Sequence, residues 1–298
     1  MTYLLLLLGL VLLIGGGELL VRSAVRIAEH LGLSPMLIGL TIVGMGTSMP
    51  ELAASIQAAL AGSPGLALGN IVGSNIANLL LILGVAAVIA PFAVPRRVLW
   101  RDGGMGLLCI GMLIIAGHTV GLTRAVGMFF VFGIVGYIYL AIRQELAGGE
   151  HGAVFDKAMA LEEVDPALVP RAESRGSVVL AIVFLLAGMA LIIWGGSMLV
   201  DAAITISASL GVSDEVIGLT VVAVGTSLPE LVTSAIAALK REGEIALGNV
   251  LGSNIYNVLF IGGITGMVSP TRIPASILQF DLWVLLCVSA LVMAFAFT

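Results

Sequence analysis

The chain has 298 residues, of which 59% are hydrophobic and only 10% are charged, whereas about a quarter of the residues in an ordinary soluble domain carry a charge. This composition, with a mean hydropathy of +1.16, excludes a soluble globular protein and indicates an integral membrane protein. The net charge of −5 provides no basic surface for nucleic acid, so we expect no DNA or RNA partner.

Nine segments are long and apolar enough to cross a bilayer as helices. They occupy roughly residues 4–25, 36–61, 66–90, 103–120, 123–142, 177–200, 215–239, 245–268 and 277–297. The first segment lacks the basic start and the small-residue cleavage site of a signal peptide, so we expect it to be a retained span. The pattern predicts an all-α membrane protein whose main partner is the lipid bilayer.

The second span contains the sequence GTSMPE. Because proline has no N–H and its ring displaces the carbonyl four residues earlier, Pro50 should interrupt this helix and free the carbonyl of Gly46. Irregular backbone survives at this depth only inside protein or beside a water-filled cavity, and a bound cation would be a natural partner for it. Thr47 and Ser48 precede Glu51 by four and three residues, which predicts that their oxygens share one helix face.

The third span carries a second polar pair, Ser74 and Asn78, which are four residues apart and should also share a face. Asn75 directly follows the serine and points elsewhere, so we expect it to be a packing or capping group. Asp102 begins the next span, and we expect it and Asp281 to cap their helices.

Residues 143–176 are polar and rich in acids, which predicts a linker between two halves. Of the 13 Lys and Arg residues in the chain, eleven fall in the loops on the linker's side of the predicted spans. The other side holds only Arg124 and Arg272. The excess of positive charge on cytoplasmic loops therefore predicts a cytoplasmic linker and an external N-terminus.

The second half repeats the first, and the hexapeptide recurs as GTSLPE 179 residues later. Residues 33–60 align without gaps on 212–239, and residues 66–84 align on 245–263. Five spans precede the linker, so the second copy enters the membrane from the opposite side. Inverted repeats are typical of secondary transporters, whose sites lie near the midplane where interrupted helices meet.

The second copy supplies the same polar groups in register: Thr226, Ser227, Glu230, Ser253 and Asn257, with Asn254 in the place of the packing or capping asparagine. Together the two copies form an all-oxygen set with two carboxylates. Calcium takes six to eight oxygen ligands, whereas soft transition metals prefer Cys or His, and neither residue type occurs in this set. The pattern therefore predicts a site for a hard cation.

Two copies of G-T-S-x-P-E, each followed by G-N-x-x-G-S-N-I-x-N, resemble the α-repeats of the cation/calcium exchanger superfamily, in its sodium/calcium exchanger branch. The chain resembles the compact prokaryotic members, which implies an integral multi-pass protein of a prokaryotic inner membrane. The resemblance implies two inverted-topology repeats of about five transmembrane helices, with helices 2 and 7 interrupted at the ion site. It also implies secondary active antiport of calcium for sodium by alternating access, with no covalent cofactor.

On this reading, residues 1–142 form the first repeat with helices 1–5, residues 143–176 form the linker, and residues 177–298 form the second repeat with helices 6–9. Members of this family usually have ten spans. The counterpart of 123–142 would lie beyond Thr298, so the second repeat is expected to lack its last helix.

The resemblance also implies which residues bind each ion. The glutamates after the proline hold calcium together with backbone carbonyls of the neighbouring threonines, which implies Glu51, Glu230, Thr47 and Thr226. The same glutamates hold sodium together with the serine and amide positions, which implies Ser48, Ser74, Asn78, Ser227, Ser253 and Asn257. Some relatives have Asp at one amide position, so the ion stoichiometry stays open.

Other functions compete with this one. A calcium/proton antiporter stays open, because one of two neighbouring carboxylates can carry a proton in place of the metal. The neutral oxygens favour sodium, however, and the proton-coupled branch typically has G-N-x-x-E in its repeats. A passive cation channel is less favoured, because channel filters are usually built by symmetry around a pore. An intramembrane hydrolase would need a catalytic motif such as a Ser/His pair, paired aspartates or H-E-x-x-H. No histidine lies within the core of a predicted span, so we expect no enzymatic activity.

Overall fold

The structure, a computed structural model, describes residues 2–94, 96–147, 175–210 and 223–297. Within these residues the regular structure is helical, apart from a single bridge between Leu122 and Thr271. Seven helices are long and apolar enough to cross a membrane, and an eighth crossing consists of two helices bent by 42° at a break. These helices confirm the predicted all-α membrane fold.

The described helices of the second half follow the same order as their counterparts in the first half. The first half contains α1 (Thr2–Leu31), α2 (Pro35–Ile38), η1 (Gly39–Val43), α3 (Gly44–Thr47), α4 (Met49–Leu60), α5 (Pro64–Ala77), η2 (Asn78–Ile82), α6 (Leu83–Ile89), α7 (Arg96–Val98), η3 (Leu99–Gly103), α8 (Gly104–His118) and α9 (Arg124–Ala147). The second contains α11 (Arg175–Ser209), α13 (Ala223–Thr226), α14 (Leu228–Leu239), α15 (Gly243–Tyr256), η6 (Asn257–Ile261), α16 (Gly262–Val268), η7 (Ile277–Asp281) and α17 (Leu282–Phe297). The segments marked η are single π-helical turns that continue the neighbouring helices.

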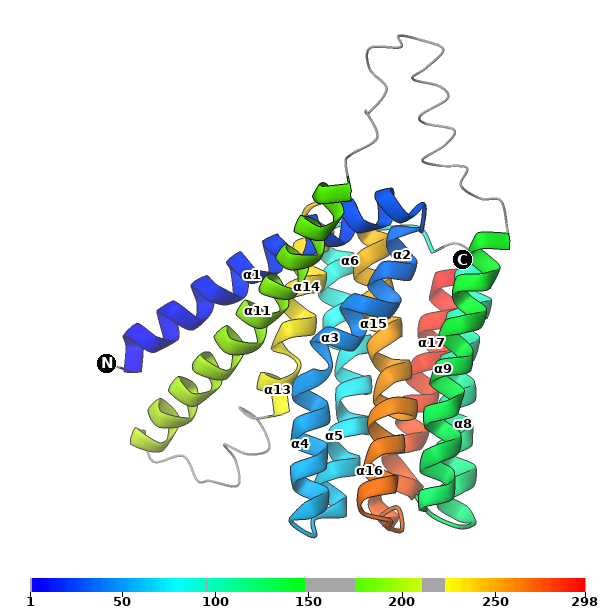
Figure 1. The fold of residues 1–298 in the computed structure, drawn as a ribbon. Coiled ribbons are helices and arrows are strands. Elements are labelled where there is room, and N and C mark those ends of the chain that lie inside the picture. The colour runs from blue at the N-terminus through cyan, green and yellow to red at the C-terminus, as the bar shows by residue number, and fades with distance from the viewer. Residues whose placement is uncertain (1, 95, 148–174, 211–222, 298) are drawn as a thin grey trace, which may run out of the picture.

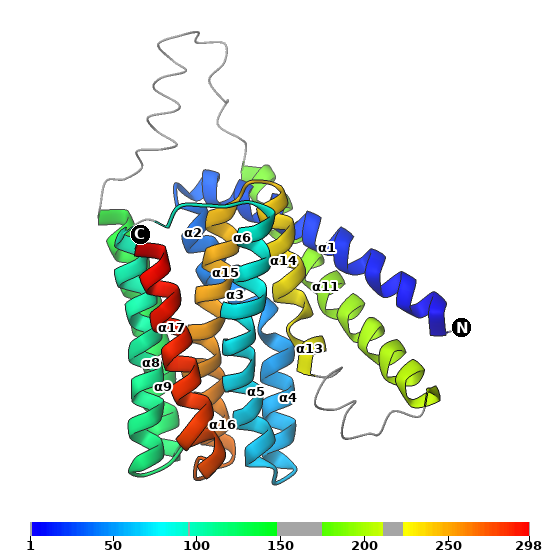
Figure 2. The same cartoon turned by 180° about the vertical axis from the view of Figure 1, so that it is seen from behind.

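Two parts are evident in the arrangement of these helices. Most of them stand upright in one bundle, while α1 and α11 run in opposite directions beside each other and slant away from it (Figures 1 and 2). Their backbones approach closely. A Cβ on Gly16 would lie 2.9 Å from the carbonyl oxygen of Gly188, and one on Gly188 would lie 2.8 Å from that of Gly16. Small residues allow this contact between membrane helices.

The two interrupted helices run in opposite directions through the bundle. In Figure 1, α3 lies above α4, whereas α13 lies below α14. The second copy of the motif is thus inverted relative to the first, as the odd number of spans predicts. Part of the predicted seventh span, residues 215–222, lies outside the described residues.

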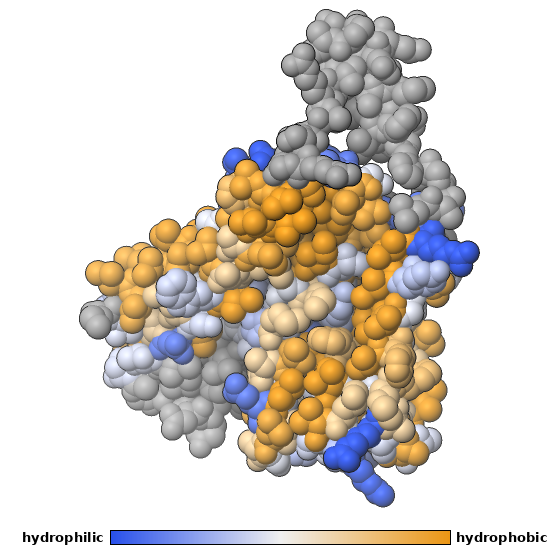
Figure 3. Space-filling view, viewed as in Figure 1, coloured by the Kyte–Doolittle hydropathy of each residue, from blue (hydrophilic) through white to orange (hydrophobic). Residues whose placement is uncertain are grey.

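The surface has the character expected in a bilayer. Apolar side chains dominate the face of the upright bundle in Figure 3, and the strongest hydrophilic colour gathers mainly toward its ends. Large side chains such as Phe129 and Phe132 are 62% and 74% exposed. Exposed apolar area on this scale is incompatible with water and is typical of a lipid-facing surface.

Among the described residues, α9 has no counterpart in the second repeat. Helix α9 covers α16, where a Cβ on Gly263 would lie 2.9 Å from the carbonyl oxygen of Gly127. The counterpart of Gly263 in the first repeat is Gly84, 179 residues earlier. A Cβ on Gly84 would have no described atom within 4 Å. The face of α6 that corresponds to the covered face of α16 is therefore open in the described part of the chain.

The linker region and two aspartates near helix ends differ in how they compare with the sequence expectations. The linker expected at 143–176 lies mostly outside the described residues, with α9 reaching Ala147 and α11 beginning at Arg175. The capping role expected for Asp102 is wrong, because its helical run begins six residues earlier, at Arg96. Asp102 is fully buried and instead accepts hydrogen bonds from Tyr137 at 2.7 Å and Arg101 at 2.6 Å. Asp281 likewise lies inside a helical run, which starts at residue 275.

Candidate cation site

The two interrupted helices break at equivalent serines. Ser48 separates α3 from α4 with φ −83° and ψ 8°, and Ser227 separates α13 from α14 with φ −91° and ψ 7°. Pro50 and Pro229 follow in the first turn of the new helix, where proline is well tolerated. The N–H of Ser48 donates to the Gly44 carbonyl oxygen at 3.2 Å and only approaches that of Gly46, the carbonyl that was expected to be free.

Each serine at a break contacts the glutamate of the other repeat. The Ser48 hydroxyl donates to Glu230 Oε1 at 3.0 Å, and the Ser227 hydroxyl donates to Glu51 Oε1 at 3.1 Å. We expected Ser48 to share a helix face with Glu51 in its own repeat. The carbonyl oxygen of Ser48 accepts the first hydrogen bond of α4, from the Leu52 N–H at 3.1 Å, so the shared face stays a prediction and the contacts across the repeats are additional to it. The two repeats are thus bonded to each other through their glutamates.

The threonines before the breaks use their hydroxyls differently. Thr47 Oγ1 lies 3.1 Å from the Val43 carbonyl oxygen and 3.0 Å from Asn249 Oδ1. Its hydroxyl is therefore engaged within the protein, which leaves the backbone carbonyl as the group for a ligand, as the resemblance implies. Thr226 is half-buried and also makes contacts.

Two asparagines that the sequence analysis did not single out donate hydrogen bonds to the backbone of the two glutamates. Asn70 donates to the Glu51 carbonyl oxygen at 3.1 Å, and Asn249 donates to the Glu230 carbonyl oxygen at 3.3 Å. Both side chains also donate to a buried serine four residues after the glutamate, each at 2.9 Å. The available signal was that both belong to the repeated G-N dipeptide.

The predicted ligands Asn78 and Asn257 lie at the same point of their helices, where each begins a π-helical turn, η2 or η6. Such turns are frequent at functional sites. Asn78 Nδ2 donates to Asn254 Oδ1 at 3.0 Å, and Asn257 Nδ2 donates to Asn75 Oδ1 at 2.8 Å. The expected packing asparagines, Asn75 and Asn254, thus contact the predicted ligands of the opposite repeat.

The serines on α5 and α15 complete the set. Ser74 is 6% exposed and Ser253 is fully buried. The Ser253 hydroxyl lies 3.4 Å from the carbonyl oxygen of Gly44, at the start of α3. Nine of the ten predicted site residues are buried in the centre of the protein, and Thr226 is half-buried.

Four predicted ligand atoms are buried without a hydrogen-bond partner: Glu51 Oε2, Asn78 Oδ1, Glu230 Oε2 and Asn257 Oδ1. All four are acceptor oxygens, and each repeat contributes the same two. Among the described residues, no cationic side chain forms an ion pair with either glutamate. Buried polar atoms are nearly always bonded, so these four oxygens are free to accept a hydrogen-bond donor or a cation.

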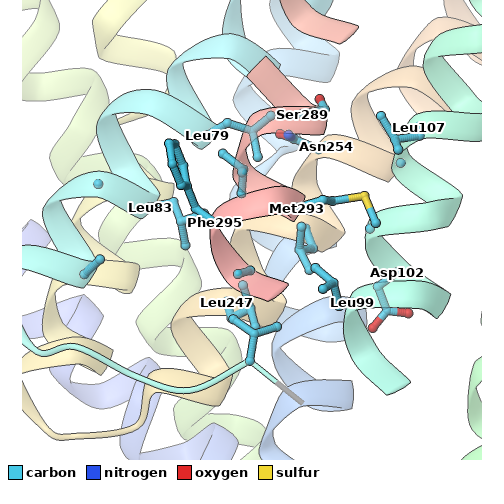
Figure 4. Close-up of a pocket in the computed structure, with 18 of the residues that line it drawn as sticks. Leu79, Leu83, Leu99, Asp102, Leu107, Leu247, Asn254, Ser289, Met293 and Phe295 are labelled. Atoms are coloured by element: carbon cyan, nitrogen blue, oxygen red, sulfur yellow. The ribbon is translucent and has the colours of Figure 1, made fainter. Parts of the chain in front are cut away.

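A cavity beside the candidate cation site is a different feature. It has a volume of about 390 Å³ and lies among α6, α8, α15 and α17, with mainly apolar side chains such as Leu79 and Met293 on its wall (Figure 4). Asn75 and Asn254 also line it, whereas none of the ten predicted ligands does. The cavity therefore adjoins the asparagines behind the candidate cation site and is separate from the site itself.

Comparisons with known proteins identify the family and agree with the fold. The model of the family described as sodium/calcium exchanger protein matches residues 1–143 and 180–298. Sodium/calcium exchanger MaX1 of Methanosarcina acetivorans is 36% identical over 100% of this chain and 91% of its own length. Inner membrane protein YrbG of Escherichia coli is 35% identical over 96% of this chain and 85% of its own length. The sodium-calcium exchanger NCX_Mj, in crystals soaked with 10 mM Na⁺ and no Ca²⁺, superimposes with a TM-score of 0.81 at 32% identity, covering 99% of this chain and 90% of that one.

Proposed function

The chain belongs to the sodium/calcium exchanger protein family, and from that premise we propose that it exchanges calcium for sodium across the membrane by alternating access. It is an integral multi-pass membrane protein with the inverted-repeat fold. As a member of an exchanger family it is a transporter and not an enzyme. The coupling ion, the ligands and the orientation are the parts that we propose.

One observation supports the proposal most strongly, namely the four unpartnered buried oxygens of Glu51, Asn78, Glu230 and Asn257. Burying an ionised carboxylate without a partner costs several kcal/mol. Two such carboxylates, contributed symmetrically by the two broken helices, create a strong demand for positive charge. A divalent ion neutralises both at once, and hard oxygen ligands of this kind suit calcium.

We propose that calcium is held by the glutamates and the threonine carbonyls, and sodium by the same glutamates with the serine and amide oxygens. The residues are Thr47, Ser48, Glu51, Ser74, Asn78, Thr226, Ser227, Glu230, Ser253 and Asn257. Because both ions need the same two carboxylates, they compete, and competition for one site is what couples their opposite movements. The neutral oxygens matter for sodium, since a proton on a glutamate has no need of them.

Burial of the site favours alternating access over a channel. Glu51 and Glu230 are each 1% exposed, so neither carboxylate is open to solvent in this conformation. A channel needs a continuous path through its selectivity site, whereas an exchanger opens its site to one face at a time. A passive cation channel is therefore the weaker alternative, and calcium/proton antiport is the stronger one.

We propose that the end of the bundle where α9 finishes and α11 begins faces the cytoplasm, with the N-terminus outside. The support is the charge asymmetry in the sequence, with eleven of the 13 basic residues expected on that side. By the similarity to YrbG, described as an inner membrane protein, we place the chain in a prokaryotic inner membrane.

A flux experiment tests the coupling ion. Proteoliposomes loaded with sodium and diluted into sodium-free medium at equal pH should take up calcium, and a sodium ionophore should abolish the uptake. A second set, with a proton gradient and no sodium, should take up little. Liposomes without protein, and liposomes holding the Glu51→Gln/Glu230→Gln double variant, are the controls. Uptake that follows the pH gradient and ignores sodium contradicts sodium coupling and supports a calcium/proton antiporter.

A further inference from the structure

Four buried asparagines form a set of mutual hydrogen bonds where the two repeats meet: Asn75, Asn78, Asn254 and Asn257. We propose that Asn75 and Asn254 are positioning residues that decide which end of the Asn257 and Asn78 amides faces the bound cation. The inference rests on the proposed function, in which the latter two asparagines are ligands.

The orientation of Asn75 is determined by a backbone group. Its Nδ2 donates to the carbonyl oxygen of Asn254 at 3.1 Å. A carbonyl oxygen can only accept, so the NH₂ end of Asn75 must face it, and Oδ1 must face the other way. That Oδ1 lies 2.8 Å from Asn257 Nδ2. Asn257 therefore has to present its NH₂ to Asn75, which leaves its own Oδ1 as the free end.

Equivalent hydrogen bonds run from the second repeat to the first. Asn254 Nδ2 lies 3.3 Å from the carbonyl oxygen of Asn75, which again can only accept. Asn254 Oδ1 consequently faces Asn78 Nδ2 at 3.0 Å. The free end of Asn78 is its Oδ1, and both free oxygens are buried and unpartnered. Two backbone carbonyls thus determine which way both ligand amides are oriented.

The fixed orientation of the two ligand amides matters because the oxygen of an amide attracts a cation and its NH₂ group repels one. In a site with two unpaired carboxylates, an unheld amide would turn its NH₂ toward the negative charge before the ion arrives. Binding would then have to break that charge-assisted hydrogen bond. From the strength of hydrogen bonds to charged groups, losing the hydrogen bond that orients a ligand amide should weaken cation affinity roughly tenfold.

A double-mutant cycle tests this role. Calcium affinity of purified protein is measured by titration calorimetry, and the sodium concentration that halves calcium binding is measured by competition. Asn75→Ala should weaken both about tenfold. In an Asn257→Asp background the ligand has oxygen at both ends and no orientation to set, and one of those oxygens faces the acceptor Asn75 Oδ1, so adding Asn75→Ala there should cause no loss of affinity. Ser289→Ala, which alters the wall of the adjoining cavity, is the packing control and should leave affinity unchanged.

The symmetric pair provides a second cycle, Asn254→Ala with and without Asn78→Asp, should the first variant fold poorly. A purely structural role would lower thermal stability and yield while leaving affinity unchanged in properly folded protein, and that result overturns the inference. Equal losses of affinity in both backgrounds also overturn it, because the effect would not pass through the ligand amide. Wild-type protein that binds calcium but is not driven by sodium contradicts only the proposed sodium coupling, since calorimetry requires no coupling ion.

Discussion

The sharpest consequence of the site geometry concerns Glu230→Gln. Ser48 donates to Oε1 of this carboxylate at 3.0 Å, so the amide oxygen of the new side chain should occupy that position and keep the bond. The NH₂ group then takes the place of Oε2, the buried oxygen without a partner. A nearly isosteric change therefore removes one negative charge and one ligand oxygen while preserving the contact between the repeats.

The size of the effect follows from the burial of the site. Glu230 is 1% exposed, so water cannot take over the role of the missing ligand. Truncating one member of a buried charge pair costs about 2–5 kcal/mol, which corresponds to a loss of calcium affinity of roughly 30-fold to several thousand-fold. Glu51→Gln should fall in the same range, because Ser227 holds that carboxylate in the same manner.

Titration calorimetry on detergent-purified protein measures the affinity directly, and calcium uptake into proteoliposomes measures its consequence. Glu244→Gln, at an exposed position near the start of α15, removes the same charge outside the site and should behave as wild type. Wild-type calcium affinity in a well-inserted Glu230→Gln protein would refute the assignment of this carboxylate as a ligand.

Three further predictions use other parts of the structure. Asn257→Ala should weaken the sodium dependence of flux more than calcium binding, and equal effects in paired flux and calorimetry measurements would argue against separate ligand sets. Single cysteines at Arg97 and Arg124 in a cysteine-free background should be labelled by an impermeant maleimide from opposite faces, the second from outside, and labelling of both from one face would overturn the topology. Gly263→Ala should lower stability by about 1–3 kcal/mol through overpacking against α9, seen as a lower melting temperature in detergent. Gly84→Ala is its matched control at the uncovered counterpart, and equal melting temperatures for the two variants would contradict this account of the packing.

The helix breaks could be predicted from the sequence because their cause is local. Pro50 and Pro229 remove an N–H wherever they occur in a helix, and the duplication places both breaks at equivalent depth. The burial of Glu51 and Glu230 follows in the same way, since a carboxylate in an apolar span must lie inside the protein.

Partners across the repeats could not be predicted. The bond from Ser48 to Glu230 joins residues 182 positions apart, and only the packing of the two copies brings them together. Face periodicity relates Ser48 to Glu51 within one repeat and carries no information about which residues of the other repeat they meet. The slant of α1 and α11 could not be predicted either, since hydropathy indicates that a segment crosses the membrane but not how it tilts.

The π-helical turns that begin at Asn78 and Asn257 also bear on the history of the chain. A π turn carries one residue more than the α-helical turn it replaces, and the two turns lie 179 residues apart, the same displacement as the repeated motifs. Two independent insertions in one register would be a coincidence, whereas an insertion made before duplication appears in both copies automatically. The turn therefore belongs to the repeated unit itself, and the two copies present Asn78 and Asn257 in the same register although they run through the membrane in opposite directions.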